Sequence, residues 1–217
     1  MSIVVAIDGP AGSGKGTVTS ILADKLNLIN IDTGAMYRCV ALQSIRENCS
    51  LDDKDKITDI AKRINIEFDE DGHTYLNGED VSKAIREKDV SEIVSPISSI
   101  VSVREVLVKK QQEMADGKNV IMEGRDITTV VLPNANYKFY LDADVDCRAM
   151  RRFKQNQENG IEMSLEEIKE NIEKRDYNDM HKEVGSLMRT DDQIYIDSTS
   201  LSIDEVVEKM MSYIKER

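Results

Sequence analysis

A glycine-rich loop near the start of the chain lies between an apolar segment and a segment with helical periodicity. The apolar segment, residues 3–8, is a run of branched side chains typical of a buried parallel strand. After the loop, residues 16–26 carry apolar side chains at the spacing of a helix. Strand, glycine-rich loop and helix, in this order, are the structural context of a phosphate-binding P-loop. The start of the chain therefore predicts an α/β fold that binds a nucleoside triphosphate.

The loop supplies the residues that we expect to bind ATP: Gly9, Pro10, Ala11, Gly12, Ser13, Gly14, Lys15, Gly16 and Thr17. Its glycines let consecutive backbone N–H groups converge on phosphate oxygens, and the following helix adds the partial positive charge of its amino terminus. Lys15 is predicted to bridge the β- and γ-phosphates. Because Gly16 stands where many P-loops carry Ser or Thr, Thr17 is the predicted hydroxyl partner of the Mg²⁺ ion.

Further strand-like segments predict the rest of a sheet. Short apolar runs alternate with helical segments at residues 28–31, 120–122, 137–141 and 194–196. Such alternation is typical of parallel strands joined by right-handed crossovers. We therefore expect a single P-loop kinase domain over residues 1–217, with a three-layer α/β fold in which helices flank a five-stranded parallel sheet.

Two segments interrupt this alternation. Between about residues 50 and 100 the pattern becomes extended and alternating, with turn signals at residues 69–72 and at Asn77-Gly78. This predicts an inserted subdomain of antiparallel β and helical structure, followed by a helix over residues 98–114. Four basic residues fall within seven positions, which favours a short lid over ATP at about residues 148–163. They are Arg148, Arg151, Arg152 and Lys154.

Composition excludes several classes of protein. The net charge is 29 − 41 = −12, so the overall field repels a nucleic-acid polymer, whereas a local group of arginines can still bind a small anion. No run of 18 apolar residues and no signal peptide is present, so we expect a cytoplasmic protein without a membrane segment. Three widely spaced cysteines and two histidines fit neither a disulfide framework nor a zinc site.

The placement of arginines indicates what receives the phosphate. An enzyme that phosphorylates an alcohol needs a carboxylate base, whereas a phosphate acceptor is already ionised and needs arginines to hold two anions together. Arg38, Arg104 and Arg125 are the candidates, and Arg125-Asp126 follows a predicted strand at the end where ligands bind. The pattern favours a phosphate acceptor.

Three motifs together resemble the bacterial cytidylate kinase family. They are IDGPAGSGKGT at residues 7–17, DTGAMYR at residues 32–38 and GRDITTVVLPNA at residues 124–135. The resemblance extends to LNGEDV at residues 76–81, to the basic residues at 148–152 and to DST at residues 197–199, and so covers essentially the whole chain. It implies a monomeric enzyme of pyrimidine nucleotide metabolism that transfers the γ-phosphoryl group of ATP to CMP or dCMP. The insert would then bind the nucleoside monophosphate.

The resemblance also implies roles for individual residues. Lys15, Arg125, Arg151 and Arg152 would meet the negative charge of the transferring group, and Thr33, Arg38 and Arg125 would hold the acceptor phosphate. Ser95, Arg104 and Asp126 would read the cytosine edge, which offers an amino donor to a carboxylate and acceptors to an arginine. Arg175 and Asp179 would lie near the acceptor ribose and phosphate. Lys182 stands where many relatives carry arginine, and lysine lacks the bidentate fork.

Three alternatives remain open from the sequence. The acceptor could be another monophosphate, such as UMP or AMP. The chain could be a switch that hydrolyses ATP slowly, although its arginine-rich acceptor segments count against this. It could also be a small-alcohol kinase in which Asp126 is the catalytic base.

Overall fold

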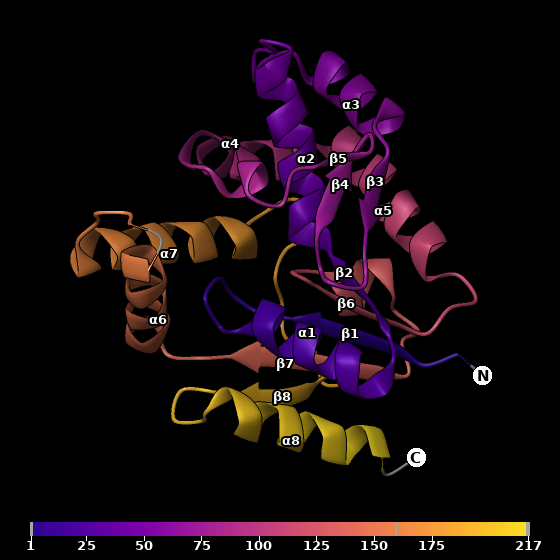
Figure 1. The fold of residues 1–217 in the computed structure, drawn as a ribbon, viewed down its shortest axis with the longest axis vertical. Helices are drawn as coiled ribbons and strands as arrows, with labels where there is room; N and C mark the ends of the chain where they lie inside the picture. The colour runs from indigo at the N-terminus through magenta and orange to yellow at the C-terminus, as the bar shows by residue number, and fades with distance from the viewer. Residues whose placement is uncertain (1, 159, 216–217) are drawn as a thin grey trace.

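A five-stranded parallel sheet with the strand order β2-β6-β1-β7-β8 forms the centre of the computed structural model, which describes residues 2–158 and 160–215 (Figure 1). The strands are β1 (Val4–Asp8), β2 (Ile29–Asp32), β6 (Val120–Gly124), β7 (Tyr137–Asp142) and β8 (Ile194–Asp197). All neighbouring pairs in this sheet are parallel. The predicted α/β fold with five parallel strands is therefore confirmed.

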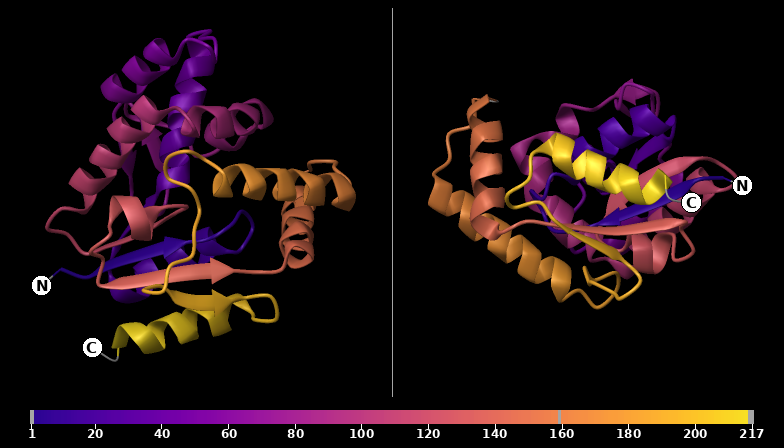
Figure 2. Two further views of the ribbon diagram at one scale, coloured as in Figure 1. Left: turned by 180° about the vertical axis from the view of Figure 1, so that it is seen from behind. Right: turned by 90° about the horizontal axis from the view of Figure 1, so that it is seen from below.

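Helices cover both faces of the sheet, and the alternation of side chains along β1 shows how. Val5 and Ile7 point into one core, which they share with α1 (Lys15–Leu26) and α8 (Ile203–Lys215). Ala6 points into the other core, against α2 (Thr33–Arg46) and α5 (Val101–Ala115). The two further views show helices on both sides of the sheet (Figure 2). Because β1 is buried on both faces, its sequence is a continuous apolar run.

The segment between β2 and β6 of the main sheet forms a smaller, antiparallel sheet. Its strands are β3 (Ile66–Phe68), β4 (Thr74–Leu76) and β5 (Glu79–Asp80), and its helices are α3 (Lys54–Arg63), η1 (Ala84–Arg86) and α4 (Lys88–Ser98). The predicted turn at Asn77-Gly78 is confirmed, with positive φ angles of 51° and 84° at these two residues. The helix expected over residues 98–114 begins instead at Val101, because Ser98 still belongs to α4 and Ile100 is extended.

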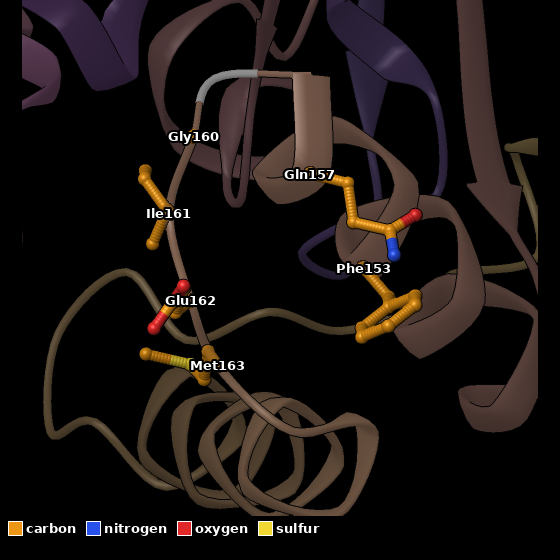
Figure 3. A pocket seen from close by; sticks show the side chains of 6 residues that line it. All are labelled: Phe153, Gln157, Gly160, Ile161, Glu162 and Met163. Carbon is orange, nitrogen blue, oxygen red and sulfur yellow. The ribbon is translucent and has the colours of Figure 1, made fainter.

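Two helices of the lid region pack against each other beside the main sheet (Figure 1). They are α6 (Val145–Glu158) and α7 (Leu165–Met180), and α7 begins with a capping box between Ser164 and Glu167. A hollow lies between the end of α6 and the segment that enters α7, with Phe153 and Met163 among its lining residues (Figure 3). Asn159, within the predicted lid, lies outside the described residues.

Membrane insertion has no support in the helices. Within residues 2–158 and 160–215, no helix combines the length and the apolar character needed to cross a bilayer.

Replacing Gly9 with alanine is expected to destabilise the fold by about 3 kcal/mol or more. A Cβ atom at Gly9 would lie 2.0 Å from the carbonyl oxygen of Leu141, which is fixed in the neighbouring strand β7. Gly78→Ala is the control, because Gly78 also has positive φ but no heavy atom within 4 Å of the added carbon. Gly78→Ala should lower the free energy of unfolding by about 1–2 kcal/mol. Urea unfolding measures both, and equal losses would contradict the steric argument.

Candidate active site

Each strand of the main sheet ends with an acidic residue at or next to its carboxyl end. These residues are Asp8 on β1, Asp32 on β2, Glu123 on β6, Asp142 on β7 and Asp197 on β8. Because the strands are parallel and in register, the carboxylates line one edge of the sheet. The P-loop and the segment after β6 start from this same edge, which is where α/β sheets bind ligands.

Lys15 lies at the first position of α1 and folds back over the P-loop. Its Nζ donates to the carbonyl oxygens of Gly9 and Pro10, each at 2.8 Å, and the side chain is almost fully buried. Burial lowers the pKa of Lys15 to about 7, with repulsion from Arg125 adding to this effect and attraction to Glu123 opposing it. A triphosphate in the loop would supply the strong anionic partner that this ammonium group lacks.

Arg148 of α6 fixes the P-loop from the side of the lid helices. Its guanidinium donates to the carbonyl oxygens of Ala143 and Ala11, at 2.8 and 3.0 Å. It also forms a buried ion pair with Asp176 of α7 at 2.5 Å. The backbone N–H of Ala11 in turn donates to Asp176 at 3.4 Å. These contacts join α6, α7 and the loop into one hydrogen-bonded unit.

Arg151, one turn along α6, also contacts the P-loop backbone. It donates to the carbonyl oxygen of Ser13 at 3.3 Å and to that of Ser198 at 2.7 Å. Arg152 lies on the exposed part of α6, and its guanidinium donates to Gln155 at 2.8 Å. The structure thus brings Arg151 to backbone carbonyls of the loop and of the β8 end, whereas the hydrogen bond of Arg152 lies within α6.

Glu123 lies directly against the start of α1. A Cβ atom at Gly16 would be 3.0 Å from the Glu123 carboxylate, so the carboxylate fills the space where other P-loops carry a hydroxyl side chain. Among the described residues, no side chain or backbone N–H donates to this carboxylate. Burial raises the pKa of Glu123 to about 7, and repulsion from Asp32 raises it further, against the attraction of Lys15.

These residues fit a hard divalent cation. The charge of Asp32 adds to the cost of ionising Glu123, and a cation between the two carboxylates would remove that cost. Thr17, the predicted hydroxyl partner, is exposed in the first turn of α1, next to Gly16. Glu123, Asp32 and Thr17 are therefore the residues that could hold Mg²⁺ with the phosphates of ATP.

A group of cations lies beside the P-loop on the acceptor side. Arg125 follows β6, Arg38 lies on α2 and Arg175 on α7. Arg38 donates to the carbonyl oxygen of Ile85 at 3.0 Å, which ties it to η1. Burial lowers the pKa of Arg175 to about 10, and repulsion from Arg125 and Arg38 contributes. The three guanidinium groups are remote in sequence, and shared contacts with Asp179 bring Arg125 and Arg175 together.

Thr33 lies between this group and the metal candidates. Its hydroxyl donates to the carbonyl oxygen of Glu123 at 2.7 Å, which joins the start of α2 to the end of β6. Asp32, the preceding residue, caps α2 by accepting from the N–H of Ala35 at 2.9 Å. The DTG sequence therefore places a hydroxyl and a carboxylate at the same edge of the sheet.

Asp179 is the main anion among these cations. It pairs with Arg125 at 2.8 Å and with Lys182 at 2.9 Å, and Arg175 lies at 3.9 Å. Burial would raise the pKa of Asp179, but attraction to Arg125, Lys182 and Arg175 outweighs it, so the carboxyl pKa lies well below its usual range. Three cations are thus held in place by one carboxylate.

Arg104 and Asp126 form a second, fully enclosed ion pair. Their atoms Nη2 and Oδ2 are 2.5 Å apart, and the side chains are 5% and 7% exposed. Arg104 lies over the ring of Tyr37, with 5.7 Å from Cζ to the ring centroid. Its Nε is buried without a hydrogen-bond partner among the described residues. Burial raises the pKa of Asp126, against the attraction of Arg104.

Ser98 lies next to this pair. Its carbonyl oxygen accepts from Arg104 at 3.3 Å, and its hydroxyl accepts from Lys182 at 2.9 Å. Ser95, the predicted residue, lies one turn earlier on α4, where its carbonyl oxygen accepts from the hydroxyl of Ser98 at 2.9 Å. The role of Ser95 stays a prediction, and Ser98 is a contact that the sequence did not single out.

Asp8 connects the P-loop strand to the acceptor side. Its carboxylate accepts from the backbone N–H groups of Ile127 and Thr128, at 2.7 and 2.9 Å, and from the Thr128 hydroxyl at 2.5 Å. These residues belong to η2 (Ile127–Val131), a π-helical turn that follows Arg125 and Asp126. Sequence reasoning assigned no role to Asp8, Asp32 or Glu123. Their shared position, at the end of a predicted apolar strand, was the available signal.

Comparisons with known proteins identify relatives of this chain. A sequence profile of the family described as cytidylate kinase matches residues 5–216. A cytidylate kinase of Caldanaerobacter subterraneus subsp. tengcongensis is 46% identical over 215 residues, which cover 99% of this chain and 96% of that protein. One of Caldicellulosiruptor bescii is 48% identical over 212 residues, which cover 96% and 94%. The crystal structure of a shikimate kinase from Bacteroides thetaiotaomicron shares the fold, with a TM-score of 0.51, 13% identity and 98% of each chain covered.

Substituting Asp179 with asparagine is expected to lower the free energy of unfolding by about 3 kcal/mol at pH 7, because three cations lose their anion. A depressed pKa contributes stability above the ordinary value near 4, and this contribution is lost as the pH falls. The difference between the wild type and Asp179→Asn should therefore narrow at pH 3. Urea unfolding at pH 7, 4 and 3 measures it.

Asp192→Asn is the matched control, because Asp192 pairs with Lys138 but its side chain is 59% exposed. Asp192→Asn should lower the free energy of unfolding by less than about 1 kcal/mol. A difference for Asp179→Asn that is small at pH 7, or that stays constant down to pH 3, would contradict the assignment.

Proposed function

The chain belongs to the cytidylate kinase family, and on this premise we propose that it transfers the γ-phosphoryl group of ATP to CMP or dCMP, giving ADP and CDP or dCDP. The observation that carries the proposal is the buried Arg104–Asp126 pair beside a cluster of arginines and a P-loop. This arrangement offers separate places for a triphosphate, a monophosphate and a polar base edge.

On the donor side, backbone N–H groups of residues 11–14 would bind the phosphates of ATP, and Lys15 would exchange the carbonyl oxygens of Gly9 and Pro10 for phosphate oxygens. Thr17, Asp32 and Glu123 would hold Mg²⁺ on the same phosphates. The ion, when bound, neutralises charge that develops on the transferring group. Arg148 and Arg151 hold the loop carbonyls, so the loop needs little rearrangement before it binds the nucleotide.

On the acceptor side, Arg38, Arg125 and Arg175 would hold the phosphate of the monophosphate, with Thr33 beside them. The phosphate has lost most of its protons at neutral pH, so no base is required (second pKa about 6). Catalysis then consists of holding two anions in line and of neutralising their charge. Lys15, Arg125, Arg151 and Arg152 are the proposed contributors to that neutralisation.

Cytosine would be recognised by the enclosed pair. The exocyclic amino group of cytosine can donate to Asp126, and its ring acceptors can receive hydrogen bonds from Arg104. Uracil presents an oxygen in place of that amino group, so a buried carboxylate would be left facing it. The pairing of Asp126 with Arg104 also disfavours a small-alcohol kinase, because a catalytic base should face the acceptor hydroxyl and not a guanidinium group.

Two segments are proposed to move during the reaction. Residues 50–100 would form the part that binds the monophosphate, since Arg38 is tied to Ile85 and Ser91 within it. Residues 148–163 would form the lid over ATP, with Arg152 on its exposed side. Closure of both would exclude water from the transfer site.

A panel of monophosphates with ATP tests the proposed function, with release of ADP as the readout. The wild type should turn over CMP and dCMP faster than UMP or AMP. Asp126→Asn keeps the shape of the side chain but removes its charge, so the ratio of kcat/KM for CMP over UMP should fall about 10- to 100-fold, while the KM for ATP changes little. Asp116→Asn, at an exposed aspartate after α5, should leave the ratio unchanged. Faster turnover of UMP than of CMP by the wild type would refute the proposal.

Glu123→Gln tests the metal assignment, because it removes the charge beside Gly16 with little change of shape. The affinity for the Mn²⁺ complex of ADP, measured by electron paramagnetic resonance, should fall about tenfold. Binding of ADP in excess EDTA, measured by calorimetry, should be unchanged or tighter. Glu67→Gln, on the exposed side of β3, is the control. An unchanged affinity for the Mn²⁺ complex would remove Glu123 from the metal site.

A further inference from the structure

Arg86 is the last residue of η1, and nothing in the sequence motifs gives it a role. Its side chain is 65% exposed, and its Nη2 lies 3.7 Å from Oδ2 of Asp32 at the end of β2. The preceding residue, Ile85, accepts a hydrogen bond from Arg38 through its carbonyl oxygen. Arg86 therefore reaches the main sheet from the inserted segment, residues 50–100, and lies next to Arg38, a proposed acceptor-binding arginine.

Charges of both signs lie near Arg86: the acids Asp32 and Glu123, and the arginines Arg38 and Arg152. Arg152 is exposed to solvent on α6, but the surrounding chain partly desolvates its guanidinium group, which lowers its pKa, and repulsion from Arg86 lowers it further. Burial also lowers the pKa of Arg38, where attraction to Asp32 opposes the repulsion from Arg86, Arg152 and Arg125. Arg86, on η1, and Arg152, on α6, thus belong to two different segments of the chain, and the charge of Arg86 acts on Arg152.

Two guanidinium groups that approach from opposite segments are favourable together only when an anion lies between them. Asp32 is the acid paired with Arg86, but at 3.7 Å and with both side chains partly exposed this contact is weak. A phosphoryl group in a site closed to water would make a stronger, forked interaction with a guanidinium. A cation bound at Asp32 would further weaken the present contact by taking up the same carboxylate charge.

We propose that Arg86 is a phosphate-binding residue of the transfer site, which leaves Asp32 and contacts the transferring phosphoryl group when both nucleotides are bound. This inference rests on the proposed kinase reaction and deepens it. Arg86 would add a cation from the acceptor-binding segment, opposite Arg152 from the lid. Closure of the two segments would then be favoured only when the phosphates of both substrates are present between them.

Arg86→Gln tests the proposal, with Lys83→Gln at the N-cap of η1 as a matched exposed control. Calorimetry compares CMP, ATP and a bisubstrate ligand in which five phosphates join cytidine to adenosine. The variant should bind the bisubstrate ligand about 10- to 100-fold more weakly, and CMP or ATP alone less than threefold more weakly. Its kcat should fall by a similar factor with little change in the KM for CMP, and Arg86→Lys should lie in between. The control should match the wild type.

Two outcomes would overturn the proposal. Equal binding of the bisubstrate ligand and an equal kcat in Arg86→Gln would show that Arg86 is only a surface ion pair with Asp32. An equal loss for CMP alone and for the bisubstrate ligand would make it an ordinary acceptor-binding residue. A wild type that prefers another monophosphate refutes the proposed function instead, and the same comparison is then made with the bisubstrate ligand of that nucleoside.

Discussion

The buried carboxylate of Asp8 is the contact on which the arrangement of the site depends. It ends the strand that leads into the P-loop, and it accepts three hydrogen bonds from Ile127 and Thr128. Burial raises the pKa of Asp8 above its ordinary value, and these hydrogen bonds offset part of that shift. Gln193 extends the contact by donating to the Thr128 hydroxyl at 2.5 Å. Donor loop and acceptor segment are thereby fixed relative to each other, which is what a reaction based on positioning requires.

Local patterns predicted most of the fold and part of the site. Strand periodicity and the glycine-rich loop identified the main sheet and Lys15, because both depend on residues close in sequence. The acids at the strand ends were not given roles, since only the strand order places Glu123 against Gly16 and Asp32 beside it. The sequence also did not predict the direction in which individual side chains point. The sequence did not predict that Arg151 contacts backbone carbonyls of the P-loop and of the β8 end. It also did not single out Ser98, whose carbonyl oxygen accepts from Arg104.

Charge is distributed unevenly between the surface and the site. The chain carries a net charge of −12, yet Arg38, Arg125 and Arg175 converge beside the P-loop. One carboxylate, Asp179, accounts for most of the balancing charge among them. A polyanion meets the repulsive overall field, whereas a small phosphate compound that enters the site meets the local cations. Arg104, by contrast, is neutralised by its buried partner Asp126.

The crowding of arginines also bears on how long the protein persists in a cell. Like charges held together lower the free energy of unfolding, and an anion bound only to the folded form restores it in proportion to the logarithm of its concentration. A folded population that is rich in bound nucleotide opens less often and exposes fewer sites to proteases. Bound nucleotide is therefore expected to protect the folded protein from proteases.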